Sequence, residues 1–508
     1  MHRAHLKSPY SAASAAFAPI LRGLRLTGLL ACAPQPAASH VKIDAFATKG
    51  DFRWALKRGL WFPLVLAAIW AIWCMASMSM QGRGVLHGES ARYITHYTDT
   101  SKTAGERIFD TGQTDGGRYQ AREFSYAADL LDFNFTVWSS RLFGLHFHPA
   151  LHYLLALLIC AMLAYALRES KAAALSLCAA TLLSPPFFIV TGVFRSAKIM
   201  AAFFLCATLL LIWAHARRGI AALPRFLRAN HGNAALPVFA AATLMGLSDR
   251  QGFAYILILT VIVICWLVIS RRKDGIPLAG GLVSAAVLCE AYNRLIGPGI
   301  ISWVTGGRPS LDCQNVGYAK ALLNPESLLT GLRMTLECAG YLAGDSGLAG
   351  GALLICACAA APVFSAKAEK DTRLFAAAAI LGGTAATIAL NAVLQTQHPH
   401  VGTADAMLAY YSVPQVVFMA LCVFMALECA PGFRPVAAAL LALCAASNMV
   451  FSGVNAQKAA NSSYQPYFTE NTRLLLRCVK GEKVSFPAGA ADYEAACNFL
   501  REKKNITR

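Results

Sequence analysis

The stretch from Leu236 to Ser270, LPVFAAATLMGLSDRQGFAYILILTVIVICWLVIS, decides the fold class. Two apolar runs, 234–247 and 252–270, lie on either side of a short polar turn, and the basic residues 271–273 follow directly. Apolar helices of about 20 residues cross the hydrocarbon core of a membrane. A basic group at the end of such a helix is typical of a cytoplasmic anchor. The stretch therefore predicts two antiparallel membrane-spanning helices.

The same pattern recurs along the whole chain, which has 508 residues, of which 56% are hydrophobic and 14% are charged. Soluble domains carry about 25% charged residues, so the composition favours an all-α polytopic membrane protein. Nine more apolar runs predict spans and bring the expected number to eleven. They are 60–80, 149–167, 172–192 (interrupted by Pro185 and Pro186), 199–214, 276–292, 345–364, 374–394, 408–428 and 436–454.

The distribution of basic residues predicts the topology. A basic flank before the first run places the N-terminus in the cytoplasm, and alternation then puts every short basic loop on the cytoplasmic side. The first loop, 81–148, and the tail, 455–508, come out extracytoplasmic, so we expect a multi-pass protein of the inner (cytoplasmic) membrane with a periplasmic C-terminus. The net charge of +18 is explained by these anchors, and nucleic-acid binding is not expected.

The chain divides into three parts by composition. Residues 1–57 form a cytoplasmic N-terminal segment, in which 1–40 contain no acid and suggest a targeting peptide or a start assigned too far upstream. Residues 58–454 form the transmembrane domain, and 455–508 form a small polar tail. Cys478 and Cys497 both lie in that tail, and an extracytoplasmic location predicts a disulfide between them.

Charged residues at the extracytoplasmic loops are the candidates for chemistry, because charges at membrane depth are costly. Arg195 and Lys198 lie three residues apart, a spacing that shares a face in a helix, and together with Arg250 they predict a phosphate-binding clamp. Anchoring at the membrane interface is the alternative for the first two. Asp249 is expected to contact substrate, although Asp249 and Arg250 could instead form an ion pair within the turn.

The first loop supplies candidates for a general base, which must lie within hydrogen-bond reach of the proton that it removes. We favour Asp115 and Glu123, which lie among glycines and arginines, and we expect Arg122 to bind substrate. Glu89 and Asp110 are rival candidates.

Residues 121–131 predict an amphipathic helix lying on the membrane. We expect Phe124, Ala127, Ala128 and Leu131 to form its apolar face. Asp132 follows at the far end of this helix and is expected to tolerate replacement by Asn.

A later loop carries His398 and His400, and Tyr410 and Tyr411 follow at the start of the next span. We expect all four to contact substrate, with a structural role as the alternative for the two histidines. Two histidines without a third ligand do not predict a metal site, so no metal is assigned, and a divalent cation is the one cofactor left open. The chain contains neither a phosphate-binding G-x-x-x-x-G-K-[ST] loop nor a G-x-S-x-G nucleophile elbow.

This arrangement resembles the GT-C superfamily of integral-membrane glycosyltransferases. The resemblance rests on the acidic first loop, on the outward basic residues Arg195, Lys198 and Arg250, on the segment from His398 to Tyr411, and on the tail. It covers most of the chain after residue 50. Members of this superfamily usually place an acidic pair just after the first span, where the nearest acid here is Glu89.

The resemblance implies transfer of a sugar from a polyprenyl-phosphate-linked donor to a glycan, lipid or protein acceptor at the outer face. Two other classes stay open. A polymerase or ligase of cell-surface polysaccharide would share the outward basic residues without needing a carboxylate base. A lipid or solute transporter should show an internal repeat and charges at the membrane midplane, and neither is visible in the sequence.

Overall fold

The protein is described by a computed structural model, in which the described elements are helices. The residues that it describes are 65, 89–99, 101–110, 119–143, 150–191, 195–217, 235–271, 273, 275–311, 318–365, 368–397, 401, 405–461, 471, 474–475, 477–478, 481–488 and 490–506.

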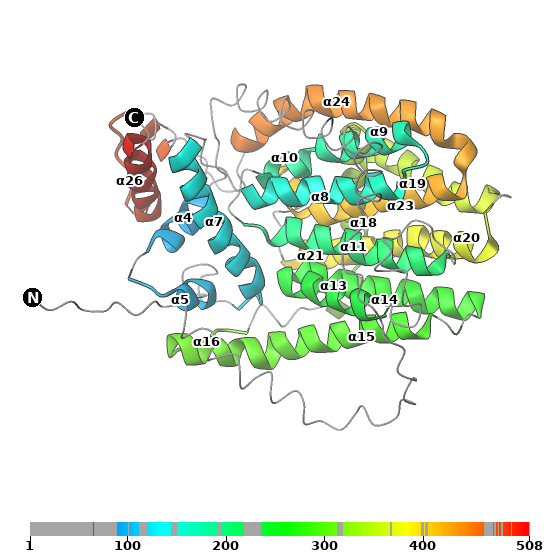
Figure 1. Ribbon diagram of the computed structural model, residues 1–508, viewed down its shortest axis with the longest axis horizontal. Coiled ribbons are helices and arrows are strands. Elements are labelled where there is room, and N and C mark those ends of the chain that lie inside the picture. The colour runs from blue at the N-terminus through cyan, green and yellow to red at the C-terminus, as the bar shows by residue number, and fades with distance from the viewer. Residues whose placement is uncertain are drawn as a thin grey trace, which may run out of the picture. The chain divides into compact units, whose positions relative to one another are not determined.

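The predicted hairpin forms two helices, α13 and α14, which pack against each other and against α15. Helix α11 packs on α13 and α23, so these five elements lie side by side (Figure 1). Their facing surfaces are large and apolar and include the fully buried rings of Trp266, Tyr255 and Phe418. The bounds are α11 Ala197–Ala216, α13 Ala235–Ser248, α14 Arg250–Ser270, α15 Ile276–Ala291 and α23 Val413–Cys429.

Further helices extend this bundle. The run 172–192 divides where its prolines predict a break, into α9 and α10, with Pro185 as the first residue of α10. The run 374–394 forms α20 and α21 joined by a π-helical turn, Ala378–Gly382. The bounds are α8 Ala150–Ala166, α9 Lys171–Leu182, α10 Pro185–Thr191, α19 Gly347–Phe364, α20 Lys370–Ala377, α21 Gly383–Gln397, α22 Asp405–Tyr411 and α24 Arg434–Asn461.

The segment 293–344, which lies between two predicted spans, is largely helical in its described residues. A π-helical turn, Tyr292–Ile296, joins α15 to α16 (Gly297–Thr305), and α18 (Pro325–Leu342) follows. Asn324 caps α18 by accepting a hydrogen bond from the Glu326 backbone. Helix α18 packs between α19 and α21. Its alternation of buried and exposed residues is that of an amphipathic helix, which a search for continuous apolar runs does not detect.

Six helices in the described part of the chain are long and apolar enough to cross a membrane: Ala197–Ala216, Arg250–Ser270, Ile276–Thr305, Gly347–Phe364, Lys370–Gln397 and Pro431–Val450. Four of the other predicted spans correspond to shorter apolar helices, α8, α9, α13 and α23. The first predicted span, 60–80, lies outside the described residues apart from residue 65. The helical membrane architecture is therefore supported, and the count of eleven spans stays a prediction.

The first loop and the tail form one packed unit, which we call the cap. It comprises α4 (Glu89–Thr98), α5 (Ala104–Phe109), α7 (Glu123–Phe143) and α26 (Ala491–Ile506), and Figure 1 shows α26 beside α4 and α7. Tyr97, Tyr126 and Phe133 pack with Tyr493 in its core. The predicted disulfide between Cys478 and Cys497 is present in this core.

Helix α7 corresponds to the predicted helix 121–131 but begins later and is longer. It runs from Glu123 to Phe143. Phe124 and Ala128 pack against the bundle, as an apolar face requires, but Leu131 is 72% exposed. The helix also buries the polar residues Asp129 and Asp132 against the bundle, which the sequence did not predict.

Candidate functional site: a buried ion cluster around Asp249

Asp249 interrupts the α13–α14 hairpin and caps the second helix. Its carboxylate oxygen Oδ1 accepts a hydrogen bond from the backbone N–H of Gln251 at 2.8 Å. An aspartate at this position satisfies one of the unpaired N–H groups that begin every helix and lies at the positive end of the helix dipole. The side chain is only 1% exposed, so its charge must be balanced by buried partners.

Two cations balance Asp249, and they come from distant parts of the chain. Lys198, in the first turn of α11, donates from Nζ to Oδ1 at 2.7 Å, and the Nε atom of Arg122 lies 3.3 Å from Oδ2. All three side chains are buried. Buried charges are tolerated when they are paired and hydrogen-bonded. The alternative expectation is an ion pair between Asp249 and Arg250 within the turn. The Asp249 carboxylate pairs instead with Lys198 and Arg122.

Tyr411, the last residue of α22, completes the cluster. The Lys198 amine lies 4.4 Å from the centroid of the Tyr411 ring, which is a cation–π geometry. Gln251 donates from Nε2 to the backbone carbonyl of Tyr411 at 2.9 Å. Tyr410 packs edge-on against Tyr411. We call Arg122, Lys198, Asp249, Gln251 and Tyr411 the Asp249 cluster.

Glu123 lies directly beside the cluster as the first residue of α7, and its carboxylate is buried. Tyr292, in the π-helical turn after α15, donates its hydroxyl to Oε2 at 3.3 Å. Tyr119 is a second phenol near this carboxylate: its burial, followed by the negative charge of Glu123, raises the pKa of the Tyr119 hydroxyl. A buried carboxylate that accepts a hydrogen bond from a phenol is a candidate proton acceptor.

Arg250 and Arg195, the other two residues predicted to bind phosphate, are not part of the Asp249 cluster. Arg250, the first residue of α14, is half-buried, and its positive charge acts on Tyr119 in the direction that lowers the phenol's pKa. Arg195 precedes the first residue of α11, so the helical spacing that was expected to align it with Lys198 does not apply. Its guanidinium lies 5.8 Å from the ring centroid of Tyr93 in the cap.

Three predicted site residues, Asp115, His398 and His400, lie outside the described residues. Of the rival bases, Asp110 ends helix α5 and forms an ion pair with Lys102, which gives it a role within the cap. The side chain of Glu89 lies outside the described part.

Two buried acids on α7 were not recognised as important from the sequence. Asp129 accepts a hydrogen bond from the Ser196 backbone at 2.7 Å, and burial raises the pKa of its carboxyl to about 6. Asp132 accepts one from the Leu151 backbone at 2.9 Å and lies 3.5 Å from Nδ1 of His152. Asp129 and Asp132 lie three residues apart, which places both on one face of a helix. This spacing was the feature of the sequence that could have identified them.

These contacts correct the expectation that Asp132 tolerates Asn. Asp132 is buried and holds α7 to the start of α8, while Asp129 holds α7 to the start of α11. An Asn at position 132 would lose the charge that faces His152.

No family model, curated protein or solved structure matches the chain. Within the described residues, no group of three or more His, Cys, Asp or Glu side chains is arranged to hold a metal ion. The chemistry of the site must therefore be argued from its charges. Two cations share one aspartate, which leaves the cluster with excess positive charge next to the Glu123 carboxylate.

Proposed function

We propose that the protein is a membrane-embedded glycosyltransferase that moves a sugar from a lipid-phosphate-linked donor to a glycan, lipid or protein acceptor on the outer face of the membrane. The observation that carries the proposal is the Asp249 cluster. It gathers buried cations and a neighbouring carboxylate where the first loop meets the ends of apolar helices. A lipid-linked substrate presents its phosphate at this depth.

The cations supply the first requirement of such a transfer. When the bond between the sugar and the phosphate breaks, the phosphate leaves with the bonding electrons and its negative charge must be stabilised by fixed positive groups. Lys198 and Arg122 are already oriented by Asp249, so they need little reorganisation to receive a phosphate oxygen. Arg250 is the first residue of α14, the helix that Asp249 caps, and is a further phosphate contact. We assign Arg195 to holding the cap through Tyr93.

Glu123 supplies the second requirement. The acceptor hydroxyl loses its proton to a base as its oxygen attacks the sugar carbon. Asp249 is engaged by two cations and a backbone N–H, whereas Glu123 accepts a hydrogen bond from the neutral Tyr292 hydroxyl, so we assign the base to Glu123. Tyr410 and Tyr411 provide flat apolar surfaces beside the cations on which a sugar ring can rest.

The cap supports the membrane orientation that we propose. The tail packs with α4 and α7 of the first loop, so both belong to one compartment, and a disulfide in the tail suits an oxidising one. We therefore propose an inner-membrane protein whose Asp249 end faces outward. Reporter fusions at positions 220 and 460 should give opposite sides; one shared side would contradict this orientation.

The activity is tested with membranes that contain the protein. Radiolabelled polyprenyl-phosphate sugars are supplied one at a time, and label is followed into glycan, lipid and protein fractions. We expect transfer from one donor, absent from membranes without the protein. Net movement of an unmodified substrate across sealed vesicles, without transfer from any donor, would replace the proposal with a transporter.

A further inference from the structure

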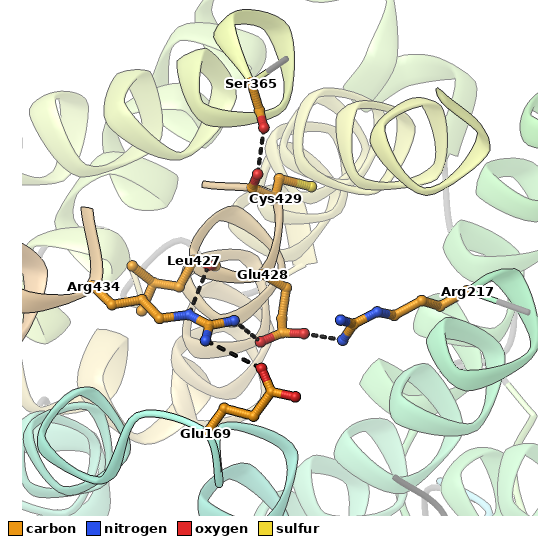
Figure 2. A network of polar contacts seen from close by, with 7 residues as sticks. All are labelled: Glu169, Arg217, Ser365, Leu427, Glu428, Cys429 and Arg434. Atoms are coloured by element: carbon orange, nitrogen blue, oxygen red, sulfur yellow. Dashed lines mark hydrogen bonds and ion pairs between the residues drawn. The ribbon is translucent and has the colours of Figure 1, made fainter. Parts of the chain in front are cut away.

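A second ion arrangement, built around the buried Glu428 carboxylate, lies at the opposite ends of the helices. Glu428, near the end of α23, pairs through one oxygen with Arg217 at the end of α11 (Figure 2). Its other oxygen pairs with Arg434, at the start of α24, at 2.5 Å. Arg434 also reaches Glu169, in the turn between α8 and α9, at 3.4 Å. We call these four residues the Glu428 cluster.

A cavity of about 290 Å³ opens beside the Glu428 cluster. One water takes up about 30 Å³ of liquid, so the cavity has room for a small polar group of several atoms. All four residues of the cluster line it, and the start of α20 adds Glu369 and Thr372.

The cavity retains unused hydrogen-bonding groups. All three guanidinium nitrogens of Arg434 are engaged, by Leu427, Glu169 and Glu428. Arg217 bonds to Glu428 through Nη1 alone among its described partners, and its side chain is 39% exposed. Thr372 is 5% exposed, yet its hydroxyl forms no hydrogen bond with the described chain. A buried hydroxyl without a partner is costly, which points to a ligand that supplies one.

The charges of the residues that line the cavity indicate which kind of ligand it can bind. Three carboxylates and two guanidiniums line the cavity, and Glu428 already neutralises much of the positive charge. The Glu369 carboxylate is exposed and has no ion pair within the described residues. Among the lining groups, the Glu369 and Glu169 carboxylates can contact a cation, whereas Arg217 and the Thr372 hydroxyl can donate hydrogen bonds to an anion.

We propose that this cavity binds a zwitterionic group that carries both an ammonium and a phosphate, as in phosphoethanolamine. The ammonium lies against Glu369 and Glu169, and the phosphate accepts hydrogen bonds from Arg217 and Thr372. The cavity is at the ends of membrane-length helices, where lipid headgroups lie, so a phosphatidylethanolamine headgroup and the free zwitterion are the two sources of this chemistry. The proposal is independent of the reaction at the Asp249 end.

The test measures thermal unfolding of the full-length protein in detergent with added ligand. Phosphatidylethanolamine should raise the midpoint by roughly 2–4 °C, because binding to the folded state alone stabilises it by mass action. Phosphatidylglycerol with the same acyl chains should not. Free phosphoethanolamine, tested at millimolar concentration, identifies the source: an equal shift indicates the soluble zwitterion, and no shift indicates the lipid.

Two variants localise the effect. Glu369→Gln and Thr372→Val should each lose at least half of the shift while unfolding normally without ligand. Glu494→Gln, an exposed change in the cap, is the matched control and should keep the full shift. The proposal is overturned if phosphatidylglycerol or plain ethanolamine reproduces the shift, or if both cavity variants respond like the control.

Discussion

The two ends of the helices carry the same ionic arrangement in different surroundings. At one end Asp249 is held by Lys198 and Arg122, and at the other Glu428 is held by Arg217 and Arg434. In the Asp249 cluster all the charged side chains are buried. The Glu428 cluster is open on one side, because Arg217 reaches solvent and a cavity lies beside it. A buried carboxylate between two cations therefore does not define a function, and what surrounds it must be considered.

The largest expected difference between the two ends is in activity. Glu123→Gln should lower the transfer rate by about 10²–10⁴-fold, because the amide keeps the shape of the side chain but cannot accept the acceptor's proton. The rate is measured with the radiolabelled donor in the membrane assay. Glu326→Gln, an exposed change at the start of α18, is the control. Full activity of Glu123→Gln would move the base elsewhere, with Asp115 next to be examined.

The second difference is in stability. Asp249→Asn leaves two buried cations without their anion and should destabilise the fold by about 3–5 kcal/mol. Glu428→Gln should cost less, because Arg217 can turn toward water. Unfolding of both variants in detergent gives the comparison. An equal or larger loss for Glu428→Gln would show that the exposure of Arg217 does not relieve its lost partner.

A third difference concerns pH, through Asp129 beside the Asp249 end. Burial raises its folded pKa to about 6 from an ordinary 3.8, so the folded state holds a proton that the unfolded state has lost between these values. The free energy of unfolding should therefore fall as pH rises from about 4 to 6 and change little above pH 6. The total decrease should be about 3 kcal/mol at most.

The variant Asp129→Asn tests this dependence. Asn keeps an oxygen for the Ser196 N–H but cannot ionise, so its unfolding midpoint should vary less between pH 4 and 7 than that of the parent protein. Identical profiles for the two proteins would assign the pH dependence to other groups.

The smallest predicted effect is on donor binding. Arg122→Ala removes one charge-assisted contact, worth about 1.5–3 kcal/mol, and should weaken donor affinity roughly ten- to a hundred-fold. Binding of the labelled donor to purified protein measures it. Arg333→Ala, on the exposed face of α18, is the control for loss of an arginine. An unchanged affinity for Arg122→Ala would limit Arg122 to holding the cap against Asp249.

The sequence by itself determined the parts of this protein that depend on local pattern. The apolar runs after residue 81 fold as helices, some of them divided into two, since a helix satisfies every backbone group of an apolar segment in a membrane. The break at Pro185 follows from its missing N–H. The disulfide between Cys478 and Cys497 was expected from two cysteines in one polar tail.

The tertiary structure alone decided which charges meet. Arg122, Lys198 and Asp249 were each selected from the sequence, but no local rule pairs them, because their contact depends on how α7, α11 and α14 pack. The inward faces of α7 and α18 were likewise missed, since an amphipathic helix can bury a polar residue when a partner is supplied from a distant helix. Hydropathy determines where helices form, and packing between them determines which ionic partners compensate a buried charge.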